Sequence, residues 1–113
     1  MTPFTVDARL QPPFKLGIDI RIHSPTCGVL MGRTLNISES GIAAILRIEV
    51  FLDEVVKLDF TLPLGHVTVY AVGRQRNAFR YGFEFVESNS EHEIIRHTCR
   101  DLAVDEALIW KDG

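Results

Sequence analysis

Apolar and polar residues alternate with a period of two through much of the chain up to residue 86. The clearest run is KLGIDIRIH at 15–23, in which every second residue is leucine or isoleucine. This pattern indicates a β-strand with one buried face. The run VVKLDFTL at 55–62 repeats it. Most of the chain is therefore expected to be built from half-buried strands.

Turn-forming residues divide this stretch into six predicted strands. Proline, glycine and the polar segment NISESG at 36–41 separate the apolar runs. The strands are expected at about 15–23, 29–35, 42–46, 55–62, 67–76 and 80–86. Short strands at such regular spacing are typical of an all-β sandwich or barrel. We therefore predict a mainly β, six-stranded antiparallel unit over residues 15–86.

The two ends of the chain differ from this region. Residues 1–14 contain three prolines and no periodicity, which predicts an extended arm. Near the other end, Ser90 precedes two glutamates, as expected for a helix N-cap with an acidic first turn. Apolar residues then recur at helical spacing. The pattern predicts a C-terminal α-helix over 90–104, followed by a tail at 105–113 that contains Leu-Ile-Trp.

Length and composition indicate one domain. The 113 residues are 46% hydrophobic and 24% charged, with a net charge of −3. These values exclude a disordered chain and fit a single domain over 1–113. We find no signal peptide and no run of about 18 apolar residues, so we expect a cytoplasmic protein without a membrane span. Cys27 and Cys99 are accordingly expected to be reduced thiols.

The net charge is unevenly distributed. Residues 1–50 carry five basic and four acidic groups, 51–86 carry four of each, and 87–113 carry three basic and seven acidic groups. The acidity therefore lies in the predicted helix and tail. A partner such as DNA or RNA needs a broad basic surface, so no nucleic-acid polymer is expected to bind.

Catalytic and metal-binding patterns are absent from the sequence. It contains no GxSxG, HExxH, P-loop or GxGxxG motif, so we do not expect an enzyme or a bound cofactor. His92 and His97 are five residues apart, which does not suit two ligands on one helix face. Together with Cys99 they are better explained by a solvated helix face than by a metal site.

The segment NISESG at 36–41 is the most informative motif, and it has two interpretations. As a polar turn, its asparagine and serines would bond the local backbone, and Gly41 would supply a positive φ. As a ligand site, Asn36 and Ser38 would offer short donors and acceptors, and Gly41 would permit close backbone approach. The spacing alone does not decide between the two.

Further segments supply the context. In chain order they are VDAR at 6–9, NISESG at 36–41, LPLG at 62–65, AVGRQR at 71–76, FRYGFEFV at 79–86 and the terminal helix. This order resembles the PilZ domain family of bacterial cyclic di-GMP receptors, over about residues 7–104. The resemblance implies a six-stranded antiparallel β-barrel with a C-terminal helix. It also implies cyclic di-GMP binding by Arg9, Asn36, Ser38 and Gly41.

The chain departs from the family in its arm. The family's second signature is RxxxR, but four residues after Arg9 stands Pro13. A proline supplies neither a guanidinium nor an N–H. Losing two charge-assisted hydrogen bonds costs on the order of 3 kcal/mol or more. Compensating cations could come from Lys15, Arg33, Arg74 or Arg76.

Two functions follow from the resemblance. The first is a small stand-alone receptor that binds cyclic di-GMP with its arm and its NxSxxG loop. The alternative is a degenerate PilZ-like adaptor that binds a protein partner, in pilus assembly or motility, without the nucleotide. Control of exopolysaccharide is a further implied role. A small β-barrel unrelated to the family is the third possibility.

Overall fold

The structure is a computed structural model that describes residues 13–86 and 91–112. It contains strands β1 (Phe14–Lys15), β2 (Asp19–Ser24), β3 (Gly28–Ile37), β4 (Gly41–Leu46), β5 (Val55–Leu62), β6 (Gly65–Asn77) and β7 (Arg80–Phe85), and one helix in this part of the chain, α2 (His92–Asp112). The six long strands correspond to the six predicted ones. The two-residue strand β1 is an addition to them.

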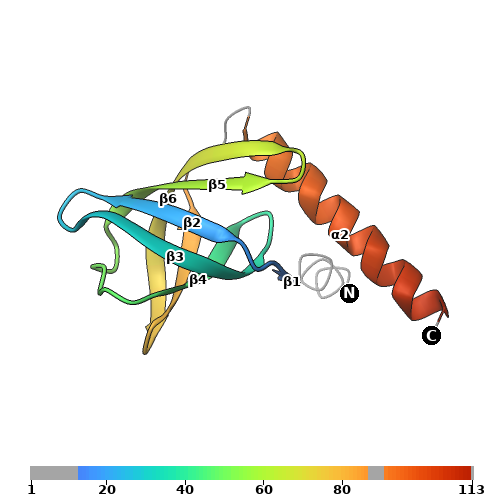
Figure 1. The fold of residues 1–113 in the computed structure, drawn as a ribbon, viewed down its shortest axis with the longest axis horizontal. Coiled ribbons are helices and arrows are strands. Elements are labelled where there is room, and N and C mark those ends of the chain that lie inside the picture. Colours follow the sequence, from blue (N-terminus) through green and yellow to red (C-terminus); the bar gives the residue numbers. More distant parts are fainter. Residues whose placement is uncertain (1–12, 87–90, 113) are drawn as a thin grey trace, which may run out of the picture.

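The strands form a closed antiparallel barrel (Figure 1). Their order is β1-β3-β2-β5-β6-β7-β4, and an additional pairing of β3 with β4 closes the sheet. Every pairing is antiparallel. The predicted six-stranded antiparallel barrel with a C-terminal helix is therefore confirmed. In Figure 1 the helix begins beside the β5–β6 hairpin, and its far end points away from the strands.

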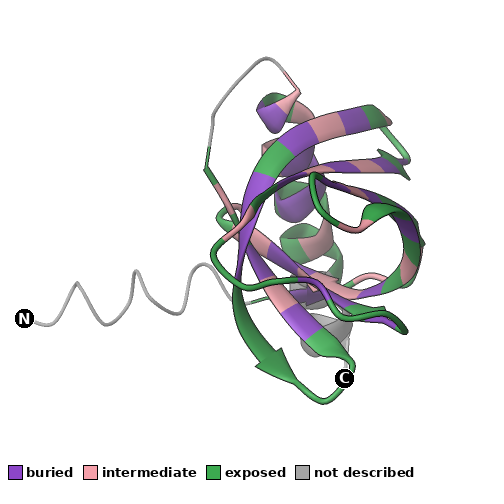
Figure 2. Ribbon diagram, turned by 90° about the vertical axis from the view of Figure 1, so that its left-hand side faces the viewer, coloured by how far each residue is buried: buried purple, intermediate pink, exposed green. Residues whose placement is uncertain are grey.

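The core lies inside the barrel, where the alternating apolar residues meet (Figure 2). Ile20, Ile22, Leu58, Val67 and Val69 are each at most 1% exposed. The first turns of α2 cover part of the barrel and add Ile95 and Cys99 to the same core. The period-two pattern thus identifies the buried face of each strand, and the helix completes the core.

The predicted strand at 15–23 is interrupted. β1 ends at Lys15 and β2 begins only at Asp19. Between them, the hydroxyl of Thr34 accepts a hydrogen bond from the N–H of Ile18 at 2.9 Å and donates one to the carbonyl of Leu16. A side chain thus replaces part of the strand ladder, next to a register shift in β3 between Thr34 and Asn36. Phe14, expected in the arm, belongs to the core.

The helix differs from its prediction at both ends. The predicted cap at Ser90 lies outside the described residues. α2 runs to Asp112, so the predicted end at 104 was wrong and most of the expected tail is helical. No glycine or proline interrupts the sequence between residues 91 and 112. In the described part of the chain, no helix is long and apolar enough to cross a membrane.

One face of α2 was also misassigned. His92 and Cys99 are 9% and 3% exposed and pack against the barrel, while His97 is exposed. The interpretation of all three as one solvated face was therefore wrong. Helical spacing explains the outcome, because residues 92, 95 and 99 share a face on which Ile95 is buried.

Candidate functional site

The loop that joins β3 to β4 is a tight, internally bonded turn. The N–H of Ser38 donates to the carbonyl of Gly41 at 2.8 Å, and the N–H of Gly41 donates to Ser38 Oγ at 3.2 Å. The N–H of Phe85, in β7, donates to the carbonyl of Ser40 at 2.9 Å. Ser38 therefore shapes the loop, and β7 holds the loop in place.

Gly41 is required by the packing of two strands. A Cβ atom at this position would lie 2.3 Å from the carbonyl oxygen of Phe83 in β7. The backbone of Gly41 is not in the positive-φ region, so the expectation of a positive φ was wrong. The close backbone approach that the motif suggested does occur, and the approaching group is the chain's own strand.

Asn36 lies in a row of residues that crosses four strands on the outer face of the barrel. In register, Asn36 lies opposite Ala43, Ala43 opposite Gly82, and Gly82 opposite Gln75. Directly opposed residues share a face of the sheet. Since the middle of the row consists of alanine and glycine, no large side chain fills the surface there. The side-chain amide of Asn36 has no hydrogen-bond partner in the described part of the chain.

A hollow of about 700 Å³ lies over this row. We call it the arginine groove; its lining residues are Pro13, Asn36, Ala43, Leu52, Arg74, Gln75, Arg76, Asn77, Arg80, Tyr81 and Gly82. An adjoining hollow of about 330 Å³ shares three of these residues and extends to Ser40 and Gly41. The groove and the NxSxxG loop therefore form one continuous surface.

Three arginines of this groove differ in their partners. Arg74 is paired with Asp53 at 3.2 Å and with Glu84 at 2.8 Å, and the hydrogen bond to Glu84 is the main cause that raises the pKa of Arg74. Arg76 is paired with Glu49, and its guanidinium lies over the ring of Tyr81, 5.9 Å from the centroid. Arg80 forms no ion pair with any described residue.

The predicted site residues are distributed unequally over this surface. Asn36 lines the groove and Gly41 the adjoining hollow, while Ser38 holds the loop between them. Arg9 lies outside the described residues, although Pro13 lies on the groove's edge. Among the candidate compensating cations, Arg74 and Arg76 line the groove. Lys15 lies opposite Asn36 in register, and Arg33 lines a different hollow.

Sequence reasoning missed Arg80 and Gln75. Arg80 alternates with buried residues in β7, so its outward orientation was available from the sequence. Gln75 lies in an exposed run at 74–77, next to a register shift in β6, where the alternation does not assign a face. The meeting of both residues with Asn36 was not available from the sequence, because it depends on the pairing of β7 with β4 and β6.

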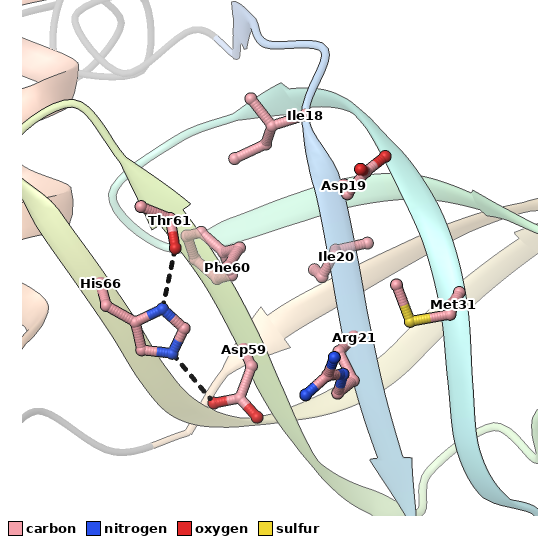
Figure 3. A pocket seen from close by; sticks show the side chains of 9 residues that line it. All are labelled: Ile18, Asp19, Ile20, Arg21, Met31, Asp59, Phe60, Thr61 and His66. Atoms are coloured by element: carbon pink, nitrogen blue, oxygen red, sulfur yellow. Dashed lines mark hydrogen bonds and ion pairs between the residues drawn. The ribbon is translucent and has the colours of Figure 1, made fainter.

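A second polar cluster lies on another part of the barrel surface (Figure 3). Asp59 accepts hydrogen bonds from Thr68 and from His23 Nε2, the latter at 2.7 Å, and His66 Nε2 lies 3.5 Å away. Burial raises the pKa of Asp59, but the bonds from Thr68 and His23 and the nearby His66 outweigh this effect and lower the pKa below 3.8. Within the described residues, no group of three or more histidines, cysteines and acidic residues is arranged to hold a metal ion.

A comparison with protein-family models identifies the family of the chain. The model described as "PilZ domain" matches residues 7–100. The chain belongs to the PilZ domain family. This family comprises cyclic di-GMP receptors that are typically not enzymes. No curated protein sequence matches the chain.

Solved structures of PilZ domains share the fold. The PilZ domain of YcgR from Escherichia coli with c-di-GMP has a TM-score of 0.69 and 13% identity, over 91% of this chain and 96% of that one. Bacillus subtilis MotI/DgrA, an inhibitor of motility, has a TM-score of 0.72 and 18% identity, over 84% of this chain and 51% of MotI. The PilZ domain of CeSA from a cellulose-synthesizing bacterium has a TM-score of 0.62 and 16% identity, over 77% and 94%.

These similarities show that the chain shares its fold, a barrel with a helix, with the three structures. The PilZ chain described here spans about half the length of MotI/DgrA and nearly all of the other two chains.

Proposed function

We propose that this PilZ domain binds cyclic di-GMP in the arginine groove. The observation that carries the proposal is the composition of the groove: Pro13 and the amide of Asn36, which has no partner among the described residues, line it together with three guanidinium groups. Cyclic di-GMP presents two phosphates and two guanines. Guanidiniums bind phosphate oxygens and the guanine O6/N7 edge with paired donors, and they stack on flat bases.

Arg80 is the proposed replacement for the missing arm arginine. It lines the groove together with Pro13, the residue that occupies the arginine position of the family motif. It makes no ion pair in the described part of the chain, so it can bind a phosphate without first leaving a carboxylate. Arg74 and Arg76 are held by Asp53, Glu84 and Glu49, and their contribution is correspondingly smaller.

Arg9 is proposed to bind the nucleotide from the arm. It lies four positions before Pro13, which lines the groove, and an extended chain of four residues spans about 14 Å at most. Asn36 is proposed to pair with a guanine edge, because its amide offers both donors and an acceptor. Ser38 and Gly41 support binding by fixing the loop, since the Ser38 hydroxyl already bonds the backbone of Gly41.

Isothermal titration calorimetry with cyclic di-GMP tests this proposal. We expect a dissociation constant below about 10 µM for the unaltered chain. Arg80→Ala and Arg9→Ala should each weaken binding by roughly 10-fold or more, because each removes charge-assisted hydrogen bonds of about 1.5–3 kcal/mol. Arg21→Ala is the matched control, because Arg21 is exposed and lines the hollow beside Asp59 (Figure 3), not the arginine groove. Equal affinities for Arg80→Ala and Arg21→Ala would refute the role of Arg80.

A second variant tests the location of the site. Ala43→Phe places a large side chain on the floor of the groove, on the outer face of the barrel. It should abolish binding while the far-ultraviolet circular dichroism spectrum stays unchanged. Absence of heat at about 100 µM ligand for the unaltered chain would refute the receptor function, since that concentration is 10-fold above the expected dissociation constant.

The adaptor function is the second candidate. Two observations favour it: Pro13 stands in place of an arginine, and Arg74 and Arg76 are already paired with carboxylates. In this case the barrel binds a protein in motility, pilus assembly or exopolysaccharide control, without the nucleotide. A pull-down from the native host would then recover the same partner for Arg80→Ala as for the unaltered chain.

A further inference from the structure

An apolar hollow of about 600 Å³ lies beside β3 and β4, separate from the arginine groove. Met31, Ile45 and Ile48 line it and are 58%, 43% and 58% exposed. Arg33 and Arg47 also line it. Large aliphatic side chains that are exposed together in this way mark surfaces that bind a partner.

The charge at this hollow is positive on balance. Arg33 is paired with Asp19 at 3.0 Å, which leaves Arg47 without an ion pair among the described residues. An acidic partner with apolar side chains would therefore match the hollow in both respects.

The chain itself carries such a partner at its C-terminal end. The first turns of α2 pack on β1, β5 and β6, but residues 103–105 are exposed, Val104 by 53%. The helix continues to Asp112, and its far end points away from the strands (Figure 1). The sequence at 101–112 contains four carboxylates and one lysine, and residues 107–110 read Ala-Leu-Ile-Trp.

We propose that the C-terminal half of α2 in one molecule docks into the apolar hollow of a second copy. The exposed Asp105 would face Arg47. The exposed Val104 would pack on Met31, Ile45 and Ile48. The hollow lies over β3 and β4, whereas α2 packs on β1, β5 and β6. The helix end therefore belongs to one surface of the molecule and the hollow to another.

This arrangement is head-to-tail. Each molecule offers one helix end and one hollow, so two molecules in contact still expose one of each. Contacts of this type build open chains, or rings if the rotation closes. The proposal does not depend on cyclic di-GMP, and it is tested without the nucleotide.

Sedimentation velocity over a range of concentrations provides the first test. The unaltered chain should form species above 12.8 kDa as its concentration rises. Arg47→Glu and Asp105→Arg should each weaken association by roughly 10-fold or more, because like charges then oppose each other. Lys57→Glu is the control, since it makes the same charge change on β5, away from the hollow. The double variant Arg47→Glu/Asp105→Arg should recover association.

A mixing experiment tests the head-to-tail geometry. Ile48→Asp disables the hollow, and Val104→Asp/Asp105→Arg disables the helix end; each protein alone should stay monomeric. Mixed in equal amounts, they should form a 1:1 complex that does not grow further, because one intact helix end meets one intact hollow. A monomeric unaltered chain at all concentrations, or no complex in the mixture, overturns the proposal. Circular dichroism of each variant verifies that the barrel is folded.

Discussion

The carboxylate of Glu39, in the loop between β3 and β4, lies 3.7 Å from the guanidinium of Arg96 in α2. Arg96 is also paired with Glu93 one turn earlier in the helix. The Glu39–Arg96 ion pair therefore connects the barrel to the helix. The NxSxxG loop, at the edge of the proposed nucleotide site, is thus joined electrostatically to α2.

A double-mutant cycle on Glu39→Gln and Arg96→Ala should give a coupling free energy of about 0.2–1 kcal/mol. Both side chains are about 40% exposed, and exposed pairs contribute no more than this. Denaturation by urea measures the coupling, which should decrease in about 0.5 M salt. Arg100→Ala, on the exposed side of the same helix, should show no coupling to Glu39→Gln.

Gly41→Ala should lower the free energy of unfolding by about 1–3 kcal/mol. Its Cβ would lie 2.3 Å from the carbonyl oxygen of Phe83, so β4 and β7 have to separate. Gly17→Ala is the matched control, because its nearest neighbour is an Arg33 side-chain nitrogen at 3.9 Å. Urea denaturation should show a change of at most about 0.5 kcal/mol for this control. Equal stabilities of the two variants would contradict the packing role of Gly41.

Tyr81→Phe should cost about 1–3 kcal/mol of stability. The hydroxyl of Tyr81, which is 1% exposed, accepts a hydrogen bond from the buried N–H of Val50 at 3.0 Å. Removing the oxygen leaves that donor unpaired. Tyr70→Phe removes the same atom from a residue that is 43% exposed, and it should be nearly neutral. Thermal unfolding of both variants tests this; equal shifts in Tm would show that the Val50 bond adds nothing.

Asp59→Asn should change how stability depends on pH. The folded pKa of Asp59 lies below its ordinary value of 3.8. A depressed carboxyl pKa contributes stability above the unfolded pKa, and this contribution is lost as the pH falls through the folded pKa. The stability difference between the unaltered chain and Asp59→Asn should therefore shrink as the pH falls from about 6 to about 3. A constant difference across this range, measured by urea denaturation, would contradict the assignment.

Cys99 should resist alkylation in the folded protein. Burial, with a contribution from the carboxylate of Glu39, raises the pKa of its thiol to about 11. At pH 8 about one thiol in a thousand is then a reactive thiolate. Iodoacetamide followed by mass spectrometry should modify Cys27, which is half-buried, before Cys99. Cys99 should react after addition of denaturant; equal rates in the folded protein would contradict its burial.

The barrel was predictable because each strand carries its own alternation of apolar and polar residues. The break between β1 and β2 was not, since it arises from the Thr34 side chain, which lies on a neighbouring strand. The length of α2 was underestimated because the apolar residues at helical spacing that predicted it run only to Leu102, whereas the helical backbone continues to Asp112.

The candidate site was predictable only in part. The motif identified Asn36 and the loop. In the structure, however, the Ser38 hydroxyl bonds within the loop, and Gly41 is needed because a side chain there would collide with Phe83. Arg80 and Gln75 come close to Asn36 only through strand register. Register depends on the pairing of distant segments, which a reading of one sequence does not provide.

The closed circuit of strands limits how this protein can associate with itself. Within residues 13–86, each of the six long strands has a neighbour on both sides. A free strand edge is the usual template on which misfolded copies add, one backbone after another, into insoluble fibres. The strand with a single neighbour, β1, is only two residues long, so the folded barrel offers little edge for such growth and should form long assemblies through side-chain contacts. Assemblies held by side-chain contacts dissociate on dilution. Self-association of this protein should therefore be reversible even in a concentrated sample.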